Sequence, residues 1–194
     1  MIRQARAFHD VPVCLISYMG VVILIIRKAD MNDIDGITHV HIESWKTTYK
    51  GIISESYLSN LSFENRKKNW SDIFSNLKQD ESVFIAENTN GSILGFAMSG
   101  RNRNHEFDHA GEIYAIYILS EFQGQGIGRL LFQETIGSLM EQGYESMMLW
   151  VLADNPSLGF YQRLGGTVIG RENIKIGEDH LIELAIGWSE LVKG

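Results

Sequence analysis

The chain has 194 residues and a formal net charge of −7 at pH 7, and 44% of its residues are hydrophobic. This length suits one domain, or one domain with a short extension, and the composition allows a buried core. The acidic balance argues against general nucleic-acid binding, which needs a basic surface. Cys14 is the only cysteine, so no internal disulfide can form, and we expect a cytoplasmic protein.

The N-terminal region contains an apolar run from Val11 to Ile26 with basic residues on both sides. A membrane anchor is one interpretation, but the run is shorter than the roughly 20 residues that span a bilayer, and proline, serine and glycine interrupt it. Its last part, Val21–Ile26, is rich in β-branched residues and predicts a buried strand. We therefore expect no membrane association, a single domain over residues 19–194, and an extension over residues 1–18 that need not be ordered.

The middle of the chain predicts two helical regions followed by three strands. Helix-capping residue types at Asp30–Asp33 precede apolar residues at helical spacing, and Gly51 ends that segment. Asn90-Gly91 is a strong hairpin signal between two alternating runs. The expected elements are helices over about 34–50 and 54–77 and strands over about 82–87, 93–99 and 112–119.

The last third of the chain begins with a glycine-rich turn at 124–128, which leads into an amphipathic helix closed by Gly143. Met147–Leu152 is apolar without alternation, as in a strand covered on both faces. The other expected elements are a short helix begun by Asn155-Pro156 and strands over about 167–176 and 180–188. The order β-α-α-β-β-β-α-β-α-β-β predicts an α/β (α+β) fold, a mixed sheet with helices on its faces.

The most informative segment is Gln123-Gly124-Gln125-Gly126-Ile127-Gly128-Arg129, which lies between a strand and a helix. Glycines let the backbone turn sharply and bring its N–H groups close to an anion. The helix that follows adds unpaired N–H groups and the positive end of its dipole. Together these features predict a pyrophosphate site that needs no net positive charge on the protein.

Other kinds of phosphate loop fit these residues less well. A Walker A loop requires Gly-Lys-Ser/Thr, which is absent, and a dinucleotide fingerprint requires glycine where Arg129 stands. A glycine-rich turn without any ligand remains open when the loop is considered alone.

A second motif follows at a fixed distance from the loop. The first is Gln123-x-x-Gly126-x-Gly128, and the second is Asn155-Pro156-x-x-x-Phe160-Tyr161-x-x-x-Gly165. Together they resemble the acyl-CoA signature of the GNAT (GCN5-related N-acetyltransferase) superfamily. The resemblance covers residues 21–188, with the specific motifs within 112–166. One departure is that the family's asparagine commonly lies one residue further from the aromatic-Tyr pair, which leaves the role of Asn155 open.

The resemblance implies a GNAT-like fold with a mixed, mostly antiparallel central sheet of about seven strands and helices on both faces. It implies an enzyme, an N-acetyltransferase that moves the acetyl group of acetyl-CoA to a primary amine by direct attack. The acceptor can be a small-molecule amine or a peptide, and a homodimer is an open alternative because dimers are common in the superfamily. A catalytically inactive CoA-binding regulatory module is the alternative function.

The resemblance also implies which residues contact acetyl-CoA. Backbone amides of the loop would hold the pyrophosphate, while Arg129 would add charge or point into solvent. The preceding strand would offer a backbone N–H, around Ile118 or Leu119, to the thioester oxygen. The cofactor-binding residues expected are Ile116, Ile118, Gln123, Gly124, Gln125, Gly126, Ile127, Gly128, Arg129, Asn155 and Tyr161.

Two residues are the candidates for acid–base catalysis. Tyr161 could donate a proton to the departing thiolate, although a tyrosine beside Phe160 could also be a packing residue. Glu112 begins a strand, and alternation places it on one face with Tyr114, Ile116 and Ile118, where it could take a proton from the amine. A solvated strand-end glutamate is the alternative, and Asp108 and His109 are reserve candidates.

An aromatic segment precedes the second helical region. Trp45-x-x-x-Tyr49-x-Gly51-x-Ile53-Ser54 resembles a segment of many bacterial members of the superfamily that borders the acceptor pocket. Trp45, Tyr49 and Tyr57 are therefore expected to combine core packing with a wall of that pocket. The histidines lack metal-ligand spacing, so no metal is expected.

Overall fold

The computed structural model describes residues 13–15 and 24–192. Most of the expected extension over residues 1–18 lies outside the described residues, as does the first half of the predicted strand at 21–26. No helix in the described part of the chain combines the length and the apolar character needed to cross a membrane.

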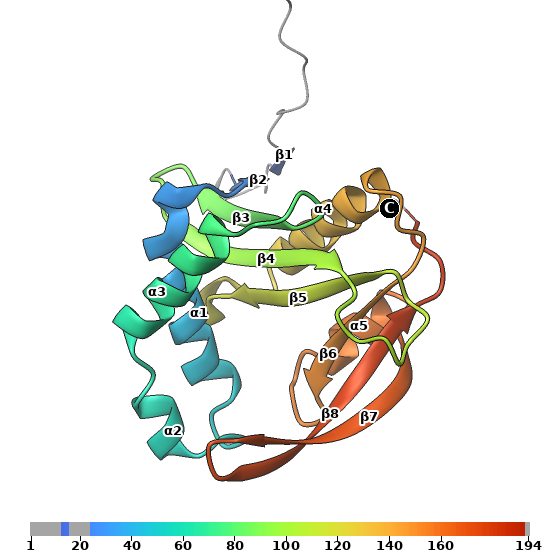
Figure 1. Cartoon of the computed structure of the whole chain (residues 1–194). Helices are drawn as coiled ribbons and strands as arrows, with labels where there is room; N and C mark the ends of the chain where they lie inside the picture. Colours follow the sequence, from blue (N-terminus) through green and yellow to red (C-terminus); the bar gives the residue numbers. More distant parts are fainter. Residues whose placement is uncertain (1–12, 16–23, 193–194) are drawn as a thin grey trace, which may run out of the picture.

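One eight-stranded sheet organises the molecule, in the order β1-β2-β3-β4-β5-β6-β8-β7 (Figure 1). The strands are β1 (Val13–Leu15), β2 (Leu24–Lys28), β3 (Ser82–Asn88), β4 (Ile93–Arg101), β5 (Gly111–Ile118), β6 (Met147–Leu152), β7 (Thr167–Ile176) and β8 (Asp179–Trp188). Among the strands that the structure describes, only β5 and β6 pair in parallel, and all other neighbours are antiparallel. The predicted mixed, mostly antiparallel sheet is therefore confirmed, with the three-residue β1 added at its edge.

Helices cover both faces of this sheet, as predicted (Figure 1). They are α1 (Ile34–Thr48), α2 (Glu55–Ser59), α3 (Phe63–Ser75), α4 (Ile127–Glu141) and α5 (Leu158–Arg163). The helices α1 and α3 pack on one face, whereas α4 and α5 pack on the other. The helical region expected over 54–77 is two helices, because the chain leaves α2 at Asn60 and Ser62 starts α3 by accepting a hydrogen bond from the Asn65 N–H.

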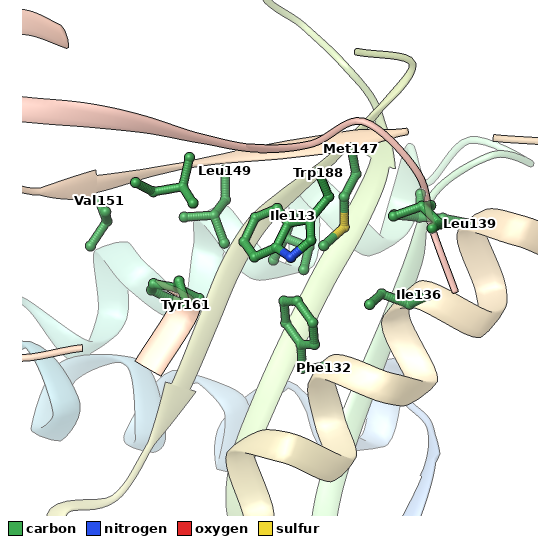
Figure 2. Close-up of a cluster of buried hydrophobic side chains, with 11 residues drawn as sticks. Ile113, Phe132, Ile136, Leu139, Met147, Leu149, Val151, Tyr161 and Trp188 are labelled. Carbon is green, nitrogen blue, oxygen red and sulfur yellow. The ribbon is translucent and has the colours of Figure 1, made fainter. Parts of the chain in front are cut away.

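The core on the α4 face gathers side chains from the strands on both sides of the parallel pair. Ile113 on β5 and Leu149 on β6 pack there against Phe132 on α4 and Tyr161 on α5 (Figure 2). Trp188 closes this cluster, and its indole N–H donates a 2.8 Å hydrogen bond to the Leu164 carbonyl. A buried indole N–H needs such a partner, so this bond ties the end of α5 to β8.

The parallel pairing of β5 and β6 is short. It joins three residue pairs, Gly111–Met147, Glu112–Met148 and Ile113–Leu149. Beyond Ile113, β5 continues beside β4 alone, while β6 continues beside β8. The two strands therefore separate, and the backbone edges that face each other there have no strand partner.

A β-bulge interrupts the alternation of β5. Met98 pairs with Ala115, whereas Ser99 pairs with Ile113, so Tyr114 is an extra residue on β5. The predicted alternation from Glu112 through Ile116 and Ile118 assumed a regular strand, and it is wrong at this point.

The bulge moves residues after it to the other face. Ile116 and Ile118 pack on the α4 face, whereas Ala115 and Tyr117 pack with the residues of α1 and α3. Because one extra residue changes the parity, Glu112 shares its face with Tyr117 and not with the two isoleucines.

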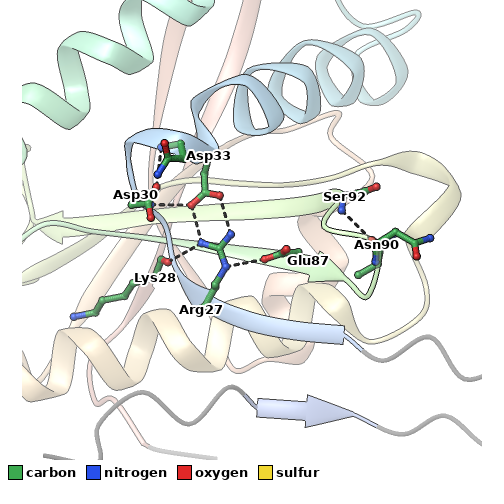
Figure 3. A network of polar contacts seen from close by, with 9 residues as sticks. Arg27, Lys28, Asp30, Asp33, Glu87, Asn90 and Ser92 are labelled. Carbon is green, nitrogen blue, oxygen red and sulfur yellow. Dashed lines mark hydrogen bonds and ion pairs between the residues drawn. The ribbon is translucent and has the colours of Figure 1, made fainter. Parts of the chain in front are cut away.

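An arginine between two carboxylates fixes the start of α1 (Figure 3). The Arg27 guanidinium donates to both carboxylate oxygens of Asp33, at 2.7 and 2.8 Å, and to Glu87 at 2.7 Å. Asp33 also accepts from the Asp30 N–H, completing the cap of the turn before α1. Burial opposes ionisation of Asp33, but the Arg27 and Asp30 hydrogen bonds outweigh it and hold the pKa of this carboxyl below its usual value.

We predict that Arg27→Gln lowers the free energy of unfolding by about 1–2 kcal/mol at pH 7, because Asp33 loses its charged partner. The loss should be no larger, because solvent already screens the ion pair of the partly exposed guanidinium. A carboxyl with a depressed folded-state pKa stabilises the fold above its unfolded pKa, and this contribution is lost as the pH falls through the folded value. The difference between wild type and variant should therefore shrink near pH 3, as measured by urea unfolding. Lys28→Gln, which removes a neighbouring charge outside this network, should change stability little at either pH.

Candidate active site

A cavity of about 720 Å³ opens where β5 and β6 separate. Its walls come from the end of α1, from β5 and β6, from the glycine loop and α5, and from the β7–β8 hairpin. The residues predicted from the sequence that line it are Glu112, Ile116, Ile118, Gln123, Gly124, Gly126, Gly128, Arg129, Asn155 and Tyr161. Residues far apart in sequence therefore meet in one cavity.

Two residues of the predicted set lie outside the cavity lining. Gln125 is exposed, and its side-chain amide donates to the Glu121 carbonyl at 3.0 Å. The Ile127 side chain is buried in the core, with 4% exposure. What Ile127 offers the site is therefore its backbone N–H in the first turn of α4.

The glycine loop leaves the start of α4 open. Gly126 is the N-cap residue with φ of 87°, a left-handed conformation that favours glycine, and it has no side chain to cap the helix. The Arg129 and Leu130 N–H groups both donate to the Gly126 carbonyl, at 3.1 and 3.2 Å. The N–H groups of Ile127 and Gly128 have no acceptor among the described residues, so the loop presents open donors at a helix N-terminus.

Gly128 brings three elements together. A Cβ atom there would lie 3.0 Å from the Ile118 Cδ1 and 3.5 Å from the Phe160 ring. Glycine at this position therefore lets α4 begin close against β5 and α5.

The edge of β5 that faces the gap carries free backbone groups. The Leu119 N–H donates to the Leu94 carbonyl on the β4 side, so Leu119 cannot be the predicted oxyanion donor. Alternate residues of a strand direct their N–H and C=O groups to opposite edges, which turns those of Ile116 and Ile118 toward the gap. The Ile118 carbonyl indeed accepts a hydrogen bond from the Gln123 side chain at 3.0 Å, which leaves the N–H groups of Ile116 and Ile118 as the donors on this edge.

Tyr161 lies on α5 and reaches the cavity from the α4 face. Its side chain is buried, and its hydroxyl has no hydrogen-bond partner among the described residues. Burial, with a smaller effect of nearby Tyr117, raises the pKa of this phenol, so it stays protonated at neutral pH. The geometry provides a neutral O–H donor directed at the space between the strands.

Asn155 also lines the cavity but does not cap α5 as predicted. Its side-chain oxygen accepts from the Ser157 N–H at 2.8 Å, and Ser157 is the N-cap residue of a helix that begins at Leu158. The Asn-Pro pair therefore forms a tight turn one step before the helix.

Aromatic side chains form the end of the cavity on the α1 face. The Tyr49 and Tyr117 hydroxyls lie 3.3 Å apart, and the Trp45 and Tyr49 rings meet edge to face at 5.0 Å. His41 stacks on Tyr117 at 5.1 Å, and burial lowers its pKa to about 3, so it is a neutral packing partner. Trp45 and Tyr49 therefore line the cavity as predicted.

Tyr57 does not line this cavity. It lines a separate hollow beside α3 and packs near Leu152 with the α1–α2 segment. The same segment is tied to the β7–β8 hairpin by the Ser54 N–H, which donates to Asp179 at 2.8 Å. Figure 1 shows α2 beside the tip of this hairpin.

Glu112 is committed to an ion pair. Its buried carboxylate accepts from the Arg103 guanidinium at 2.6 and 3.2 Å and from the Arg103 backbone N–H at 2.9 Å. The guanidinium also lies 3.9 Å above the Tyr114 ring. Asp108 and His109, the reserve candidates, are not among the residues that line the cavity.

Several cavity residues were not identified from the sequence. Arg163, in the last turn of α5, lines the same cavity as Arg129. Tyr117 and Glu183 both lay within predicted strands and were assigned no role. These three residues belong to no motif that was used and lie in three different elements, so only the cavity that they share identifies them.

Comparisons with known proteins identify the family and agree with this fold. Residues 42–166 match the acetyltransferase (GNAT) family. The chain is 37% identical over 166 residues to YuaI, an uncharacterized N-acetyltransferase of Bacillus subtilis (strain 168), covering 86% of this chain and 93% of the relative. An uncharacterized N-acetyltransferase of Archaeoglobus fulgidus is 30% identical over 130 residues, or 65% of this chain and 80% of that protein.

Solved structures share the fold. The PaiA N-acetyltransferase of Thermoplasma acidophilum, solved with coenzyme A, superposes with a TM-score of 0.64 at 27% identity, over 82% of this chain and 97% of that one. The yncA protein of Salmonella typhimurium, solved with acetyl-CoA, has a TM-score of 0.64 at 23% identity, over 88% and 95% of the two chains. The fold is that of the GNAT proteins, and this chain belongs to the GNAT acetyltransferase family.

We predict that Arg103 and Glu112 are energetically coupled. A double-mutant cycle with Arg103→Met and Glu112→Gln, read by urea unfolding, should give a coupling of about 1–3 kcal/mol, because either single change leaves a charge or a buried acceptor without its partner. The exposed pair Arg101–Asp80 is the matched control, and its cycle should give a clearly smaller coupling. A coupling near zero at Arg103–Glu112 would mean that Glu112 is free for another role.

Proposed function

We propose that this protein is an acetyl-CoA-dependent N-acetyltransferase that transfers the acetyl group to a primary amine by direct attack. The observation that carries the proposal is the single cavity in which open N–H groups of the glycine loop lie at one end and an aromatic, carboxylate-bearing pocket lies at the other. Tyr161 and the free edge of β5 lie between them.

The residues of the cavity fit the cofactor. The pyrophosphate would bind the N–H groups of the loop and of the first turn of α4, which have no other acceptor among the described residues. Arg129 and Arg163 would add positive charge at the rim, and Asn155 would contact the pantetheine part from the cavity wall. Acetyl-CoA, when bound, supplies an activated thioester.

The reaction requires three catalytic functions from the protein. A base must take a proton from the ammonium form of the acceptor, a donor must stabilise charge on the thioester oxygen, and an acid must protonate the leaving thiolate. The Ile116 and Ile118 N–H groups would stabilise the charge on the thioester oxygen, and the Tyr161 hydroxyl would protonate the thiolate. Glu112 remains a predicted base, but its carboxylate is already held by Arg103.

An inactive CoA-binding module is the competing function. A catalytically inactive module would need the site for the pyrophosphate of coenzyme A. It would not need an unpaired phenol and carboxylates in the same cavity. Tyr161, Glu112 and Glu183 all line the cavity here, which favours the enzyme.

The acceptor can be searched for among amines of distinct chemistry. Structural neighbours include a ribosomal-protein-alanine N-acetyltransferase of Brucella melitensis, at 23% identity. A panel of spermidine, phosphinothricin, free amino acids and a peptide with an N-terminal alanine, followed by release of free CoA, would test the reaction directly. Acetyl-CoA binding without acetylation of any amine tested would favour the inactive module.

We predict that Gly126→Asp weakens coenzyme A binding by at least tenfold in calorimetry. The substitution adds a carboxylate facing the pyrophosphate and strains a left-handed backbone position. The space beside Gly126 is open, with no atom within 4 Å of the place that a Cβ atom would take, so the fold should persist.

Gly143→Asp is the matched control for that change. Gly143 ends the same helix with φ of 84°, and its Cβ position is equally free of neighbours. This variant carries the same backbone strain and the same charge but lies outside the cavity lining, so its affinity for coenzyme A should equal that of wild type. Equal affinities for all three proteins would remove the phosphate-loop assignment.

We predict that Tyr161→Phe lowers kcat by roughly 10²-fold while leaving the affinity for coenzyme A unchanged. The ring and its packing remain, and only the hydroxyl that would protonate the thiolate is lost. Tyr49→Phe removes another cavity hydroxyl, one that faces Tyr117, and should not produce the same loss in kcat. A Tyr161→Phe enzyme with the wild-type rate would make this tyrosine a packing residue.

A further inference from the structure

Glu183 lies at the aromatic end of the cavity. On β8 it pairs with Leu152, the last residue of β6, and on its other side with Glu172 of β7. Leu181, two residues earlier on the same strand face, packs in the cluster that contains Tyr49. Glu183 lines the cavity on that same side, together with Tyr49 and Tyr117.

The Glu183 carboxylate is free, unlike that of Glu112. Within the described residues it forms no ion pair and accepts no hydrogen bond, although the residue is half-buried. Glu112 lines the same cavity but accepts three hydrogen bonds from Arg103. Two carboxylates therefore face one space, and only Glu183 has its lone pairs available to a ligand.

We propose that Glu183 is the carboxylate that binds the ammonium group of the acceptor and takes its proton, and that Glu112 serves to hold Arg103. This inference rests on the proposed function, since it assigns a residue to the acetyl transfer. The Tyr49 ring, which lines the same end of the cavity, would complete an ammonium site, because an aromatic face and a carboxylate both attract a cation. The acceptor class is then an aliphatic amine that is protonated at neutral pH.

The surroundings of Glu183 suit a base. Burial raises its pKa above the ordinary value of a glutamate, and the nearby carboxylates of Glu172 and Glu112 raise it further. The groups that interact electrostatically with Glu183 are Glu172 from β7, Glu112 and Tyr117 from β5 and Tyr49 after α1. Tyr161 from α5 and Arg103, the ion-pair partner of Glu112, line the same cavity. The three phenols have raised pKa values and stay neutral, so the charges that add to the effect of burial on the Glu183 pKa are those of the carboxylates.

The proton and bond changes balance with the groups present. Glu183 takes one proton from the ammonium, and the freed nitrogen lone pair forms the bond to the acetyl carbon. The C–S bond breaks, its electron pair leaves with sulfur, and the thiolate takes the proton of Tyr161. The phenolate then recovers a proton from the nitrogen, and Glu183 releases its proton to solvent, so that the products are the amide, the free thiol and one proton.

The test is the pH dependence of kcat/KM for Glu183→Gln with the panel amine that wild type acetylates fastest. At neutral pH the variant should lose roughly 10²- to 10³-fold, the range of one general base. The wild-type acidic limb, which reflects protonation of Glu183, should be absent. In its place kcat/KM of the variant should rise at higher pH, with a midpoint at the pKa of the amine itself, because only unprotonated amine can then react.

Glu172→Gln is the matched control, since it changes the same residue type directly across the β7–β8 pair. Removing this neighbouring negative charge favours ionised Glu183 and lowers its pKa, so the acidic limb should move to lower pH with kcat/KM at high pH unchanged. In Glu112→Gln the acidic limb should persist whatever the absolute rate. An acidic limb lost in Glu112→Gln and kept in Glu183→Gln would overturn the assignment.

A second measurement does not depend on finding an acceptor. In protein labelled with ¹³C at the glutamate carboxyl, NMR should show one carboxyl with a midpoint above those of the other glutamates, absent in Glu183→Gln and shifted to lower pH in Glu172→Gln. An ordinary midpoint for Glu183 would overturn the inference. Calorimetry with coenzyme A separates the two proposals. The Glu183→Gln, Glu172→Gln and Glu112→Gln variants should bind it like wild type, whereas failure of wild type to bind it would refute the proposed function itself.

Discussion

The separation of β5 from β6 after three residue pairs is the constraint on which the rest of this structure depends. Up to Ile113 the two strands satisfy each other's backbone groups, and beyond it they face a cavity. A polar backbone edge inside a protein needs partners, because an unsatisfied N–H or C=O is costly. The fold thus keeps a row of hydrogen-bonding groups ready for a ligand at the centre of its sheet.

The ends of this cavity differ in chemistry because they are built by different layers. The α4 face contributes the glycine loop and its helix N-terminus, which attract an anion through backbone dipoles in a chain of net charge −7. The α1 face contributes Tyr49, Tyr117 and the unpaired carboxylate of Glu183, which suit a cation. The gap between the strands joins the two faces, and Tyr161 reaches into it from the α4 side.

Glu112 and Glu183 show how environment separates two residues of one type. Arg103 satisfies the Glu112 carboxylate through its backbone and its side chain. Burial opposes ionisation of Glu183, and the neighbouring carboxylates of Glu172 and Glu112 raise its pKa further. Pairs of carboxyl groups held in contrasting surroundings are a common way for one site to combine structural and acid–base roles.

The sequence by itself determined the local features of this protein. Met147–Leu152 is a strand with the predicted bounds, and the glycine-rich turn leads into a helix as expected, because apolar runs and glycine positions act over a few residues. Tertiary structure decided the features that depend on strand pairing. The bulge at Tyr114 moved Glu112 away from the face of Ile116, and only the pairing of β8 with β6 brought Glu183 to the cavity. Alternation predicts which residues share a face only while a strand stays regular, and it contains no information about which distant strand lies beside it.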